Sequence, residues 1–510
     1  MTVPVPLLEL KAVSKQFVTT LDLAARIANF FAEPSLSLVQ RRVQQLSADD
    51  LTRQLWFIRA SLATLSMDLN RLPSYRLTEP SAMASQQRLL EAAAAIGDHL
   101  ETLALRSEQD VSWLGLTSSG GGHWSLAPLG IDLYDGLPGV ALFLAYLGAL
   151  TGQERYTALA QAALMTVRTL VARSRSFLTV LGAFDGWGGM IYTLTHLAVL
   201  WDQPALLAEA EEIIEHLPAL IEQDQQFDII SGAAGCLASL LSLYHCAPSE
   251  RTLAAAIQCG DHLIARAQTR ETGIGWIIPS TVPKPLSGFS HGAAGIAWAL
   301  LGLAALTGEE RFRAAALAAI TYERSLFSPE AGNWRDLREF ETSRPTTESD
   351  PESFVTAWCH GAPGIGLARL RSLPHLDDAT IREEIDTALH TTLAQGFGSN
   401  HSLCHGDLGN LELLLQASQV LEDPQWGFEV DRLAAVILES ISQHGWLCGV
   451  PLGVESPGLM TGLAGIGYGL LRVAEPARVT SVLALAPPHM TPVKAEQAAS
   501  RQAAAREQAS

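Results

Sequence analysis

Apolar stretches of helical length recur along the chain, and each follows a Gly-x-x-Gly pair. The pairs begin at Gly136, Gly186, Gly232, Gly292, Gly361, Gly406 and Gly462. Intervals between successive pairs run from 45 to 69 residues. Each stretch is apolar nearly all round the predicted helix, which is typical of a buried helix. A local pattern that recurs seven times indicates a repeat architecture.

The segments between these stretches are amphipathic. In residues 204–217 and 310–326, apolar side chains recur at intervals of three and four, the spacing of one helix face. We find no convincing alternation of apolar and polar residues that would mark a strand. Two packed layers bury both kinds of helix, and closing the ring covers the apolar ends that an open stack exposes. We therefore predict an all-α fold, an (α/α)7 toroid of seven inner and seven outer helices.

The flanking segments lack the glycine pairs. Residues 1–115 are predicted to form an additional helical segment, in which Ser47 and Asp50 resemble a capping box. One face of that helix is apolar and carries Leu51, Leu55, Ile58, Leu62 and Leu65. The Ser- and Gly-rich run 113–124 predicts a loop or linker. We predict the toroid over residues 116–480 and a disordered or loosely helical tail over residues 481–510.

Charge and composition narrow the classes of function. The net charge is −19 and we find no basic run, which argues against nucleic-acid binding. The apolar runs fall short of the ~18 residues of a membrane span, and residues 1–13 lack the pattern of a secretory signal. Six cysteines in 510 residues are too few for a disulfide scaffold. We expect a cytoplasmic protein that neither spans a membrane nor binds nucleic acid.

Candidate catalytic and metal-binding residues lie just before the glycine pairs. Equivalent repeats should point these residues to one end of the toroid, and the residues are Asp135, Asp185, Ser231, His291, His360, His405 and Thr461. One position earlier, Cys359 and Cys404 occupy equivalent places in consecutive repeats. Neighbouring helices lie roughly 8–10 Å apart, so both sulfurs can reach one ion. With one histidine they predict a zinc site that keeps an open, catalytic position. Spacing alone leaves both His360 and His405 as the third ligand.

The ligand charges suggest the reaction. Two thiolates and a neutral imidazole cancel the charge of Zn²⁺, and zinc lowers the pKa of a further thiol that joins them. An electron-rich ligand set keeps that sulfur nucleophilic, which favours thiol alkylation over amide hydrolysis. Addition of sulfur to an activated alkene gives an enolate that needs a proton. His291 and the acidic rim residues are the candidate donors.

The glycine motifs resemble those of a known family. WCHGAPGIGLAR at residues 358–369 and LCHGDLGNL at residues 403–411, with FSHGAAGIAWAL and FDIISGAAG, closely resemble the cyclase domain of class II lanthionine synthetases. The resemblance spans residues 125–475. It implies that peptide cysteine thiolates are added to dehydroalanine or dehydrobutyrine of a dehydrated lanthipeptide precursor. The products are the lanthionine and methyllanthionine rings of peptide antibiotics.

The same resemblance implies roles for particular residues. Cys359, Cys404 and His405 would bind zinc, His291 would be the acid/base histidine and Asp228 would support it. His360 stands where single-function cyclases can carry tyrosine, and we keep it as a further catalytic candidate. Those cyclases have an arginine one helical turn before the first zinc cysteine, where this chain has Val355. Spacing alone would have favoured Asp135 or Asp185 over Asp228.

The segment before the toroid departs from the class II pattern. Residues 50–65 resemble the end of a dehydratase domain, but residues 1–110 contain no Gly-rich phosphate loop followed by lysine. We expect that this chain does not dehydrate serine or threonine itself, and a separate dehydratase subunit is a candidate partner.

Two other functions are compatible with a helical toroid that binds zinc. A zinc-dependent protein prenyltransferase subunit also forms a helical toroid, but its zinc set includes an aspartate and its lipid pocket is aromatic, whereas 7% of this chain is aromatic. The second rival is a non-catalytic zinc-containing module that holds the peptide for a separate dehydratase.

Overall fold

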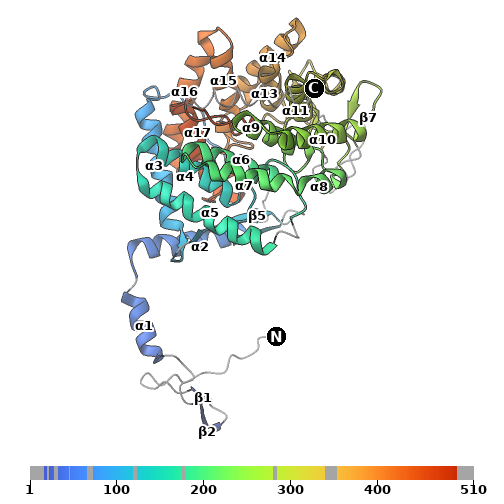
Figure 1. The fold of residues 1–510 in the computed structure, drawn as a ribbon. Coiled ribbons are helices and arrows are strands. Elements are labelled where there is room, and N and C mark those ends of the chain that lie inside the picture. The colour runs from blue at the N-terminus through green and yellow to red at the C-terminus, as the bar shows by residue number, and fades with distance from the viewer. Residues whose placement is uncertain are drawn as a thin grey trace. The chain divides into compact units, whose positions relative to one another are not determined.

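A computed structural model describes residues 17–19, 22–27, 33–44, 46–65, 73–108, 110–118, 123–174, 178–278, 284–338 and 353–490. The chain divides into a small unit, residues 1–59, and a large unit, residues 60–510. Figure 1 shows the helices and strands of both units.

The small unit contains two strands and two helices in its described part. Strands β1 (Phe17–Thr19) and β2 (Asp22–Ile27) pair antiparallel, and α1 (Ser35–Gln44) follows them. Helix α2 (Ala48–Ala63) begins in this unit and continues into the large one. The Ser47 hydroxyl accepts a hydrogen bond from the Asp50 N–H at 3.1 Å, which confirms the predicted start of the helix. Its apolar positions are exposed, among them Leu51, Leu55 and Ile58.

Seven inner helices follow the glycine pairs in the described residues of the large unit. They are α4 (Leu137–Thr151), α6 (Trp187–Leu200), α9 (Ala233–Cys246), α11 (Ala293–Thr307), α13 (Ala362–Ser372), α15 (Asp407–Val420) and α17 (Leu463–Ala474). Each begins one residue after the first glycine of its pair, and most of its side chains are buried. Successive inner helices pack together, and α17 packs against α4.

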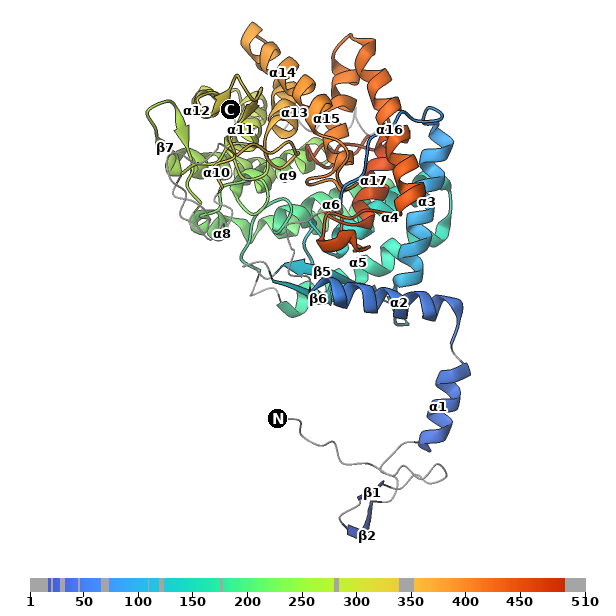
Figure 2. The ribbon, with the colours of Figure 1, turned by 180° about the vertical axis from the view of Figure 1, so that it is seen from behind.

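The outer layer also has seven members in the described residues. It comprises α5 (Glu154–Ser174), the pair α7 (Pro204–Ile214) and α8 (Leu217–Gln223), α10 (Glu250–Arg266), α12 (Glu310–Arg324), α14 (Ala379–Gln395), α16 (Pro424–His444) and α3 (Gln86–Leu103). Helix α3 packs against α17, and Figures 1 and 2 show the two side by side. The boundary predicted at residue 116 is therefore too late, because α3 belongs to the toroid.

A ring of backbone hydrogen bonds closes the toroid at one end. The bonds join the segments that lie two or three residues before the first glycines, and in each bond an N–H donates to a carbonyl of the next segment at 2.6–3.3 Å. The bonds run from Tyr134 to Phe184, Phe184 to Ile230, Ile229 to Ser290, Ser290 to Cys359, Cys359 to Cys404, Cys404 to Met460, and Met460 to Tyr134. Because the series returns to its first residue, the ring is closed. The predicted (α/α)7 toroid is confirmed.

The second glycine of each pair is required by this ring. A Cβ atom on Gly409 would lie 1.8 Å from the carbonyl oxygen of Leu403, and one on Gly465 would lie 1.6 Å from that of Leu459. In both cases the carbonyl belongs to the residue six positions earlier. Any side chain would therefore push the inner helix away from the turn that precedes it.

Short hairpins link the helices, which the sequence pattern did not predict. They pair β3 (Leu105–Arg106) with β4 (Val111–Ser112), β5 (Leu114–Ser118) with β6 (Trp124–Pro128), β7 (Gln268–Thr269) with β8 (Ile274–Gly275), and β9 (Phe327–Ser328) with β10 (Asn333–Trp334). The predicted loop 113–124 is therefore mostly a hairpin, apart from residues 119–122, which lie outside the described residues. Strands of two to five residues are too short to reveal alternation.

The chain after α17 packs into the toroid. Val482, Leu483 and Leu485 are buried, and the Trp358 indole N–H donates to the Leu483 carbonyl at 3.2 Å. The Ala486 carbonyl accepts hydrogen bonds from the inner helix α6, at 3.0 Å from the Tyr192 hydroxyl. The tail predicted from residue 481 thus starts too early, and residues 491–510 lie outside the described residues.

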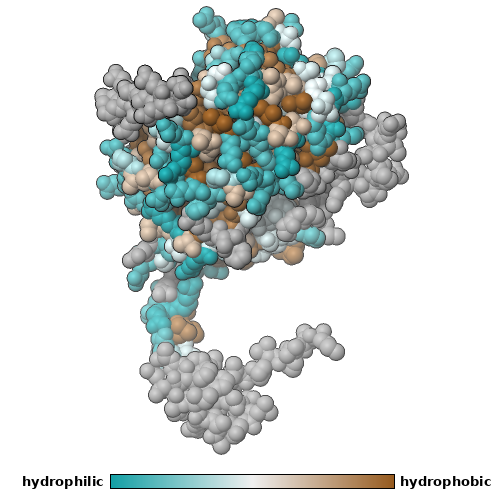
Figure 3. Space-filling view, turned by 45° about the vertical axis from the view of Figure 1, so that its right-hand side comes forward, coloured by the Kyte–Doolittle hydropathy of each residue, from teal (hydrophilic) through white to brown (hydrophobic). Residues whose placement is uncertain are grey.

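The surface agrees with two helical layers. On the face in Figure 3, hydrophilic side chains of the large unit are interspersed with hydrophobic ones, as expected where amphipathic helices form the outside. Among the helices that the structure describes, none is both long enough and apolar enough to cross a bilayer.

Candidate functional site

The residues directly before the first glycines meet at one end of the toroid, as the sequence predicted. The Ser231 hydroxyl donates to Asp185 at 2.9 Å, and the Thr461 N–H donates to Asp135 at 3.0 Å. Each contact joins neighbouring repeats. We call this end the rim, defined by Asp135, Asp185, Ser231, His291, His360, His405 and Thr461.

Cys359 and Cys404 are neighbours below the rim. The Cys359 N–H donates to the Cys404 carbonyl at 3.3 Å, and both side chains are buried. A hydrogen bond from the Cys404 thiol, together with the charges of Arg338 and His291, lowers the pKa of Cys359 despite its burial. The pKa of Cys404 is raised well above its usual range by this pairing and by burial. The pairing therefore favours ionisation of Cys359 over that of Cys404.

Tyr134 supports the cysteine pair. Its hydroxyl donates to the Cys404 sulfur at 3.0 Å, and burial raises the pKa of the phenol well above its usual value. The hydroxyl therefore stays protonated and stabilises negative charge on sulfur. Tyr134 occupies the position of the two cysteines in the first repeat, but spacing alone does not predict its contact with sulfur.

His405 is oriented through one ring nitrogen. Its Nε2 lies 3.1 Å from the Gly449 carbonyl oxygen, so Nε2 carries the proton and Nδ1 carries the lone pair. Burial lowers the pKa of His405, which keeps the imidazole neutral. Gly449 leaves room for the ring, since a Cβ atom there would lie 2.7 Å from Nε2. A neutral imidazole with one free nitrogen is the form that binds metals.

The three predicted ligands do not form a closed metal cage. In the part of the chain that the structure describes, no three His, Cys, Asp or Glu side chains are close enough together to hold one metal ion. The ligand set Cys359, Cys404 and His405 therefore stays a prediction.

His291 and Asp228 form a pair across two repeats. The Asp228 carboxylate is 2% exposed, and one of its oxygens lies 2.6 Å from His291 Nδ1. Its other oxygen accepts the N–H groups of Ser231 and Gly232 at 2.7 and 3.1 Å, which places it at the start of α9. Burial favours the neutral ring, but Asp228 outweighs burial and raises the pKa of His291. The imidazole is 35% exposed, so part of the ring is accessible at the rim.

Comparison with known proteins identifies the family. The sequence profile described as "Lanthionine synthetase C-like protein" matches residues 127–484. The chain belongs to this family. A curated relative, the lacticin 481/lactococcin biosynthesis protein LcnDR2 of Lactococcus lactis subsp. lactis, is 22% identical over 462 residues. That alignment covers 84% of this chain and 45% of the relative, so the chain spans less than half the relative's length.

The fold of this lanthionine synthetase C-like chain is also known from a solved structure. Nisin cyclase matches with a TM-score of 0.55 and 16% identity, over 78% of this chain and 96% of that one. At this identity the match concerns the fold. Together with the relative from Lactococcus, it confirms the resemblance to lanthionine synthetases that the glycine motifs predicted.

His360 lies beside His291 in the rim of this family member. The two rings stack with centroids 5.8 Å apart, and His360 is 1% exposed. Neither of its ring nitrogens has a hydrogen-bond partner among the described residues. Burial, followed by the charge of Arg338, lowers the pKa of His360 to about 3. The ring is therefore neutral at physiological pH.

Arg338 is a site residue that sequence reasoning missed. It follows β10, and the Asp336 carboxylate holds its guanidinium through contacts of 3.0 and 2.7 Å. Its charge acts on Cys359 and His405. Val355 carries no charge, and the cation of this site comes from a different segment. No repeat spacing marks Arg338, because it lies in a link between two repeats.

The rim carries further carboxylates. Burial raises the pKa of Asp135 to about 7 and that of Asp185 to about 6, despite hydrogen bonds from Thr461 and Ser231. The Asp185 side chain is open to solvent. Asp135 lies close enough to Cys404 to raise the pKa of that thiol, so carboxylates line the rim beside the cysteines as well.

Proposed function

We propose that the chain is a zinc-dependent lanthipeptide cyclase. In this proposal a cysteine thiolate of a dehydrated precursor peptide adds to dehydroalanine or dehydrobutyrine, which gives a lanthionine or methyllanthionine ring. The observation that carries the proposal is that two reactive pairs of residues lie at the same end of the toroid. They are the paired thiols Cys359 and Cys404, and the His291–Asp228 pair.

The chemistry of the donors fits zinc. Cys359, Cys404 and His405 would hold the ion, and one coordination position would remain for a substrate thiol. When bound, zinc lowers the pKa of that thiol into the neutral range. Tyr134 and Arg338 favour negative charge on the sulfurs, and the Gly449 carbonyl leaves the lone pair of His405 on Nδ1.

His291 is suited to the proton transfer. Sulfur bonds to the β-carbon of the dehydro residue, the double bond opens, and negative charge develops on the α-carbon and its carbonyl oxygen. A proton must then reach the α-carbon. The Asp228 carboxylate fixes Nδ1 of His291 and raises the pKa of the ring, which favours the protonated form that can deliver a proton from Nε2. His360, neutral at physiological pH, contacts the His291 ring and is not assigned a proton transfer.

The substrate must arrive already dehydrated. We propose that a separate dehydratase, or a further part of a longer protein, supplies it, because the curated relative is more than twice as long as the aligned segment. Free thiols on enzyme and substrate suit a reducing, cytoplasmic compartment.

The second candidate function is a non-catalytic, zinc-containing module that holds the peptide for a separate dehydratase. The greater length of the curated relative favours it, because the enzymatic steps could then lie outside the aligned segment. Zinc content does not separate the two functions, since both would bind the ion.

Ring formation separates them. A dehydrated, cysteine-containing peptide is incubated with the zinc-loaded chain, and unreacted thiols are trapped and counted by mass spectrometry. We expect the wild type to lose free thiols much faster than peptide alone, and His291→Ala to be slower by about 10²–10⁴-fold. Equal, uncatalysed rates for both proteins would favour the holding module.

A further inference from the structure

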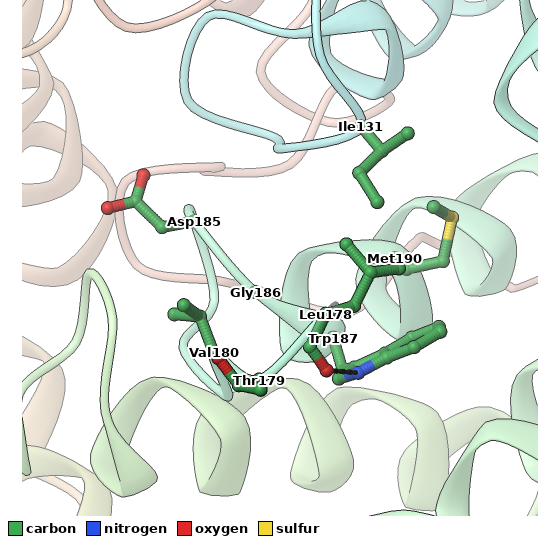
Figure 4. A pocket seen from close by; sticks show the side chains of 8 residues that line it. All are labelled: Ile131, Leu178, Thr179, Val180, Asp185, Gly186, Trp187 and Met190. Carbon is green, nitrogen blue, oxygen red and sulfur yellow. Dashed lines mark hydrogen bonds between the residues drawn. The ribbon is translucent and has the colours of Figure 1, made fainter. Parts of the chain in front are cut away.

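A small pocket opens at the rim beside helix α6. Its volume is about 80 Å³, and Ile131, Leu178, Thr179, Val180, Asp185, Gly186, Trp187 and Met190 line it. Figure 4 shows that Ile131 comes from the segment before α4, whereas the other residues belong to the turn and first helical turn of the second repeat. The pocket thus lies between the first two repeats, where the rim is acidic.

The pocket has a firm apolar floor. Trp187 and Met190 are each 5% exposed, and the Trp187 indole N–H donates to the Leu178 carbonyl at 3.1 Å. This hydrogen bond, drawn as a dashed line in Figure 4, fixes the ring and leaves its polar atom satisfied. Val180 is 39% exposed at the opening. A preformed apolar pocket, in which the indole N–H already has a hydrogen-bond partner, favours an apolar side chain as its ligand.

Asp185 connects the pocket to the proposed site. It is the one carboxylate among the described residues that line the pocket, and it accepts the Ser231 hydroxyl at 2.9 Å. The Ser231 N–H in turn donates to Asp228 at 2.7 Å, and Asp228 holds His291 at 2.6 Å. Three hydrogen bonds therefore lead from the edge of the pocket to the imidazole. A peptide whose dehydro residue lies at His291 has its neighbouring residues within reach of the pocket.

We propose that this pocket binds one aliphatic side chain of the substrate peptide, on a residue adjacent to the dehydro residue, and so sets which dehydro residue reacts. This inference rests on the proposed cyclase function. The hollow accommodates one side chain of the size of valine or leucine, and not a folded segment. Asp185, when ionised, repels an acidic side chain at the same position, so peptides with aspartate there are poor substrates.

The test uses dehydrated peptides that differ only in the residue next to dehydroalanine: leucine, alanine or aspartate. For the wild type we expect kcat/KM for the leucine peptide to exceed that for the alanine peptide by about 10-fold or more, as in other apolar pockets. Val180→Trp fills the opening from an exposed position, and we expect it to bring this ratio close to one. Val420→Trp, at an exposed valine that ends α15, is the matched control and keeps the wild-type ratio.

Aspartate tests the charge of the rim. We expect Asp185→Asn to raise kcat/KM for the aspartate peptide several-fold while the leucine peptide changes less. Equal rates for leucine and alanine peptides with the wild type, or an unchanged ratio in Val180→Trp, would overturn the pocket inference and leave the cyclase proposal standing.

Binding provides a readout that does not depend on turnover. Trp187 forms the floor, so its fluorescence should change when a leucine peptide binds, and the change should be absent in Trp187→Phe. If the wild type forms no rings with any peptide, the cyclase proposal fails. Leucine-selective binding, lost in Val180→Trp, would still support the pocket, and equal binding of leucine and alanine peptides would overturn it.

Discussion

Nδ1 of His291 lies 2.6 Å from one oxygen of Asp228, while the other oxygen of that carboxylate accepts two N–H groups at the start of α9. One carboxylate therefore orients the imidazole and caps an inner helix. Asp228→Asn retains an oxygen for the cap but removes the charge that raises the pKa of His291. We expect this variant to fold and to form rings roughly 10-fold or more slowly than the wild type.

The rate of a double variant tests whether Asp228 acts through His291. If Asp228 acts through His291, the double variant with His291→Ala should be no slower than His291→Ala alone. Rates from thiol trapping and melting curves of the four proteins test both points. A wild-type rate in Asp228→Asn would mean that the carboxylate serves only to cap α9.

Gly449 offers a test of the predicted zinc ligands that changes no ligand. A Cβ atom at this position would lie 2.7 Å from Nε2 of His405 and from the Ser402 hydroxyl oxygen, so Gly449→Ala must displace the ring from the carbonyl that orients it. We expect zinc affinity, measured by chelator competition, to fall by about 10–100-fold. Gly427→Ala, where an added Cβ meets nothing within 4 Å, is the control and should bind zinc like the wild type. Unchanged affinity in Gly449→Ala would count against His405 as a ligand.

The charge of Arg338 should affect the reactivity of the Cys359 thiol. Its charge favours the thiolate of Cys359, so its removal raises the pKa of that thiol. In zinc-free Arg338→Gln, half-maximal alkylation of Cys359 should move to higher pH, as followed by mass spectrometry of the modified peptide. Arg382→Gln removes an exposed arginine that pairs with Asp377 and should leave the profile unchanged. No shift in Arg338→Gln would show that the guanidinium is screened from the sulfur.

The toroid could be predicted because glycine is required at fixed backbone positions, and each glycine marks the start of an inner helix. The same spacing brought the cysteine positions into register. Asp228 could not be found by spacing, since a tight turn returns it to the rim from outside the repeat position. Arg338 lies in a link between repeats, where no periodicity operates.

Other parts of the fold lacked a local signal. Helix α3 completes the last repeat from the opposite end of the sequence. Because no glycine pair precedes it, the repeat pattern places it in the flanking segment. The sequence of residues 481–485 indicates the start of a tail, because their burial depends on contacts with the toroid and not on a pattern of their own.

His196 predicts how stability depends on pH. Its Nδ1 lies 2.8 Å from the Tyr146 hydroxyl and its Nε2 lies 3.1 Å from the Ala486 carbonyl oxygen, and burial lowers its pKa to about 3. An unfolded histidine has a pKa near 6.5, so below that pH the unfolded chain takes up a proton that the folded chain refuses. The contribution of His196 is therefore fully present above pH 6.5 and is lost as the pH falls toward 3.

The loss should amount to roughly 2–3 kcal/mol between pH 6.5 and 4.5, at about 1.4 kcal/mol for each pH unit. Urea unfolding at several pH values measures it. His196→Gln keeps a polar side chain without an ionisable ring, so its unfolding free energy should fall less over this range than that of the wild type. Because other histidines titrate in both proteins, the difference between the two slopes isolates His196. Parallel slopes would mean that the ring accepts a proton while folded, and that Ala486 is not held through a neutral imidazole.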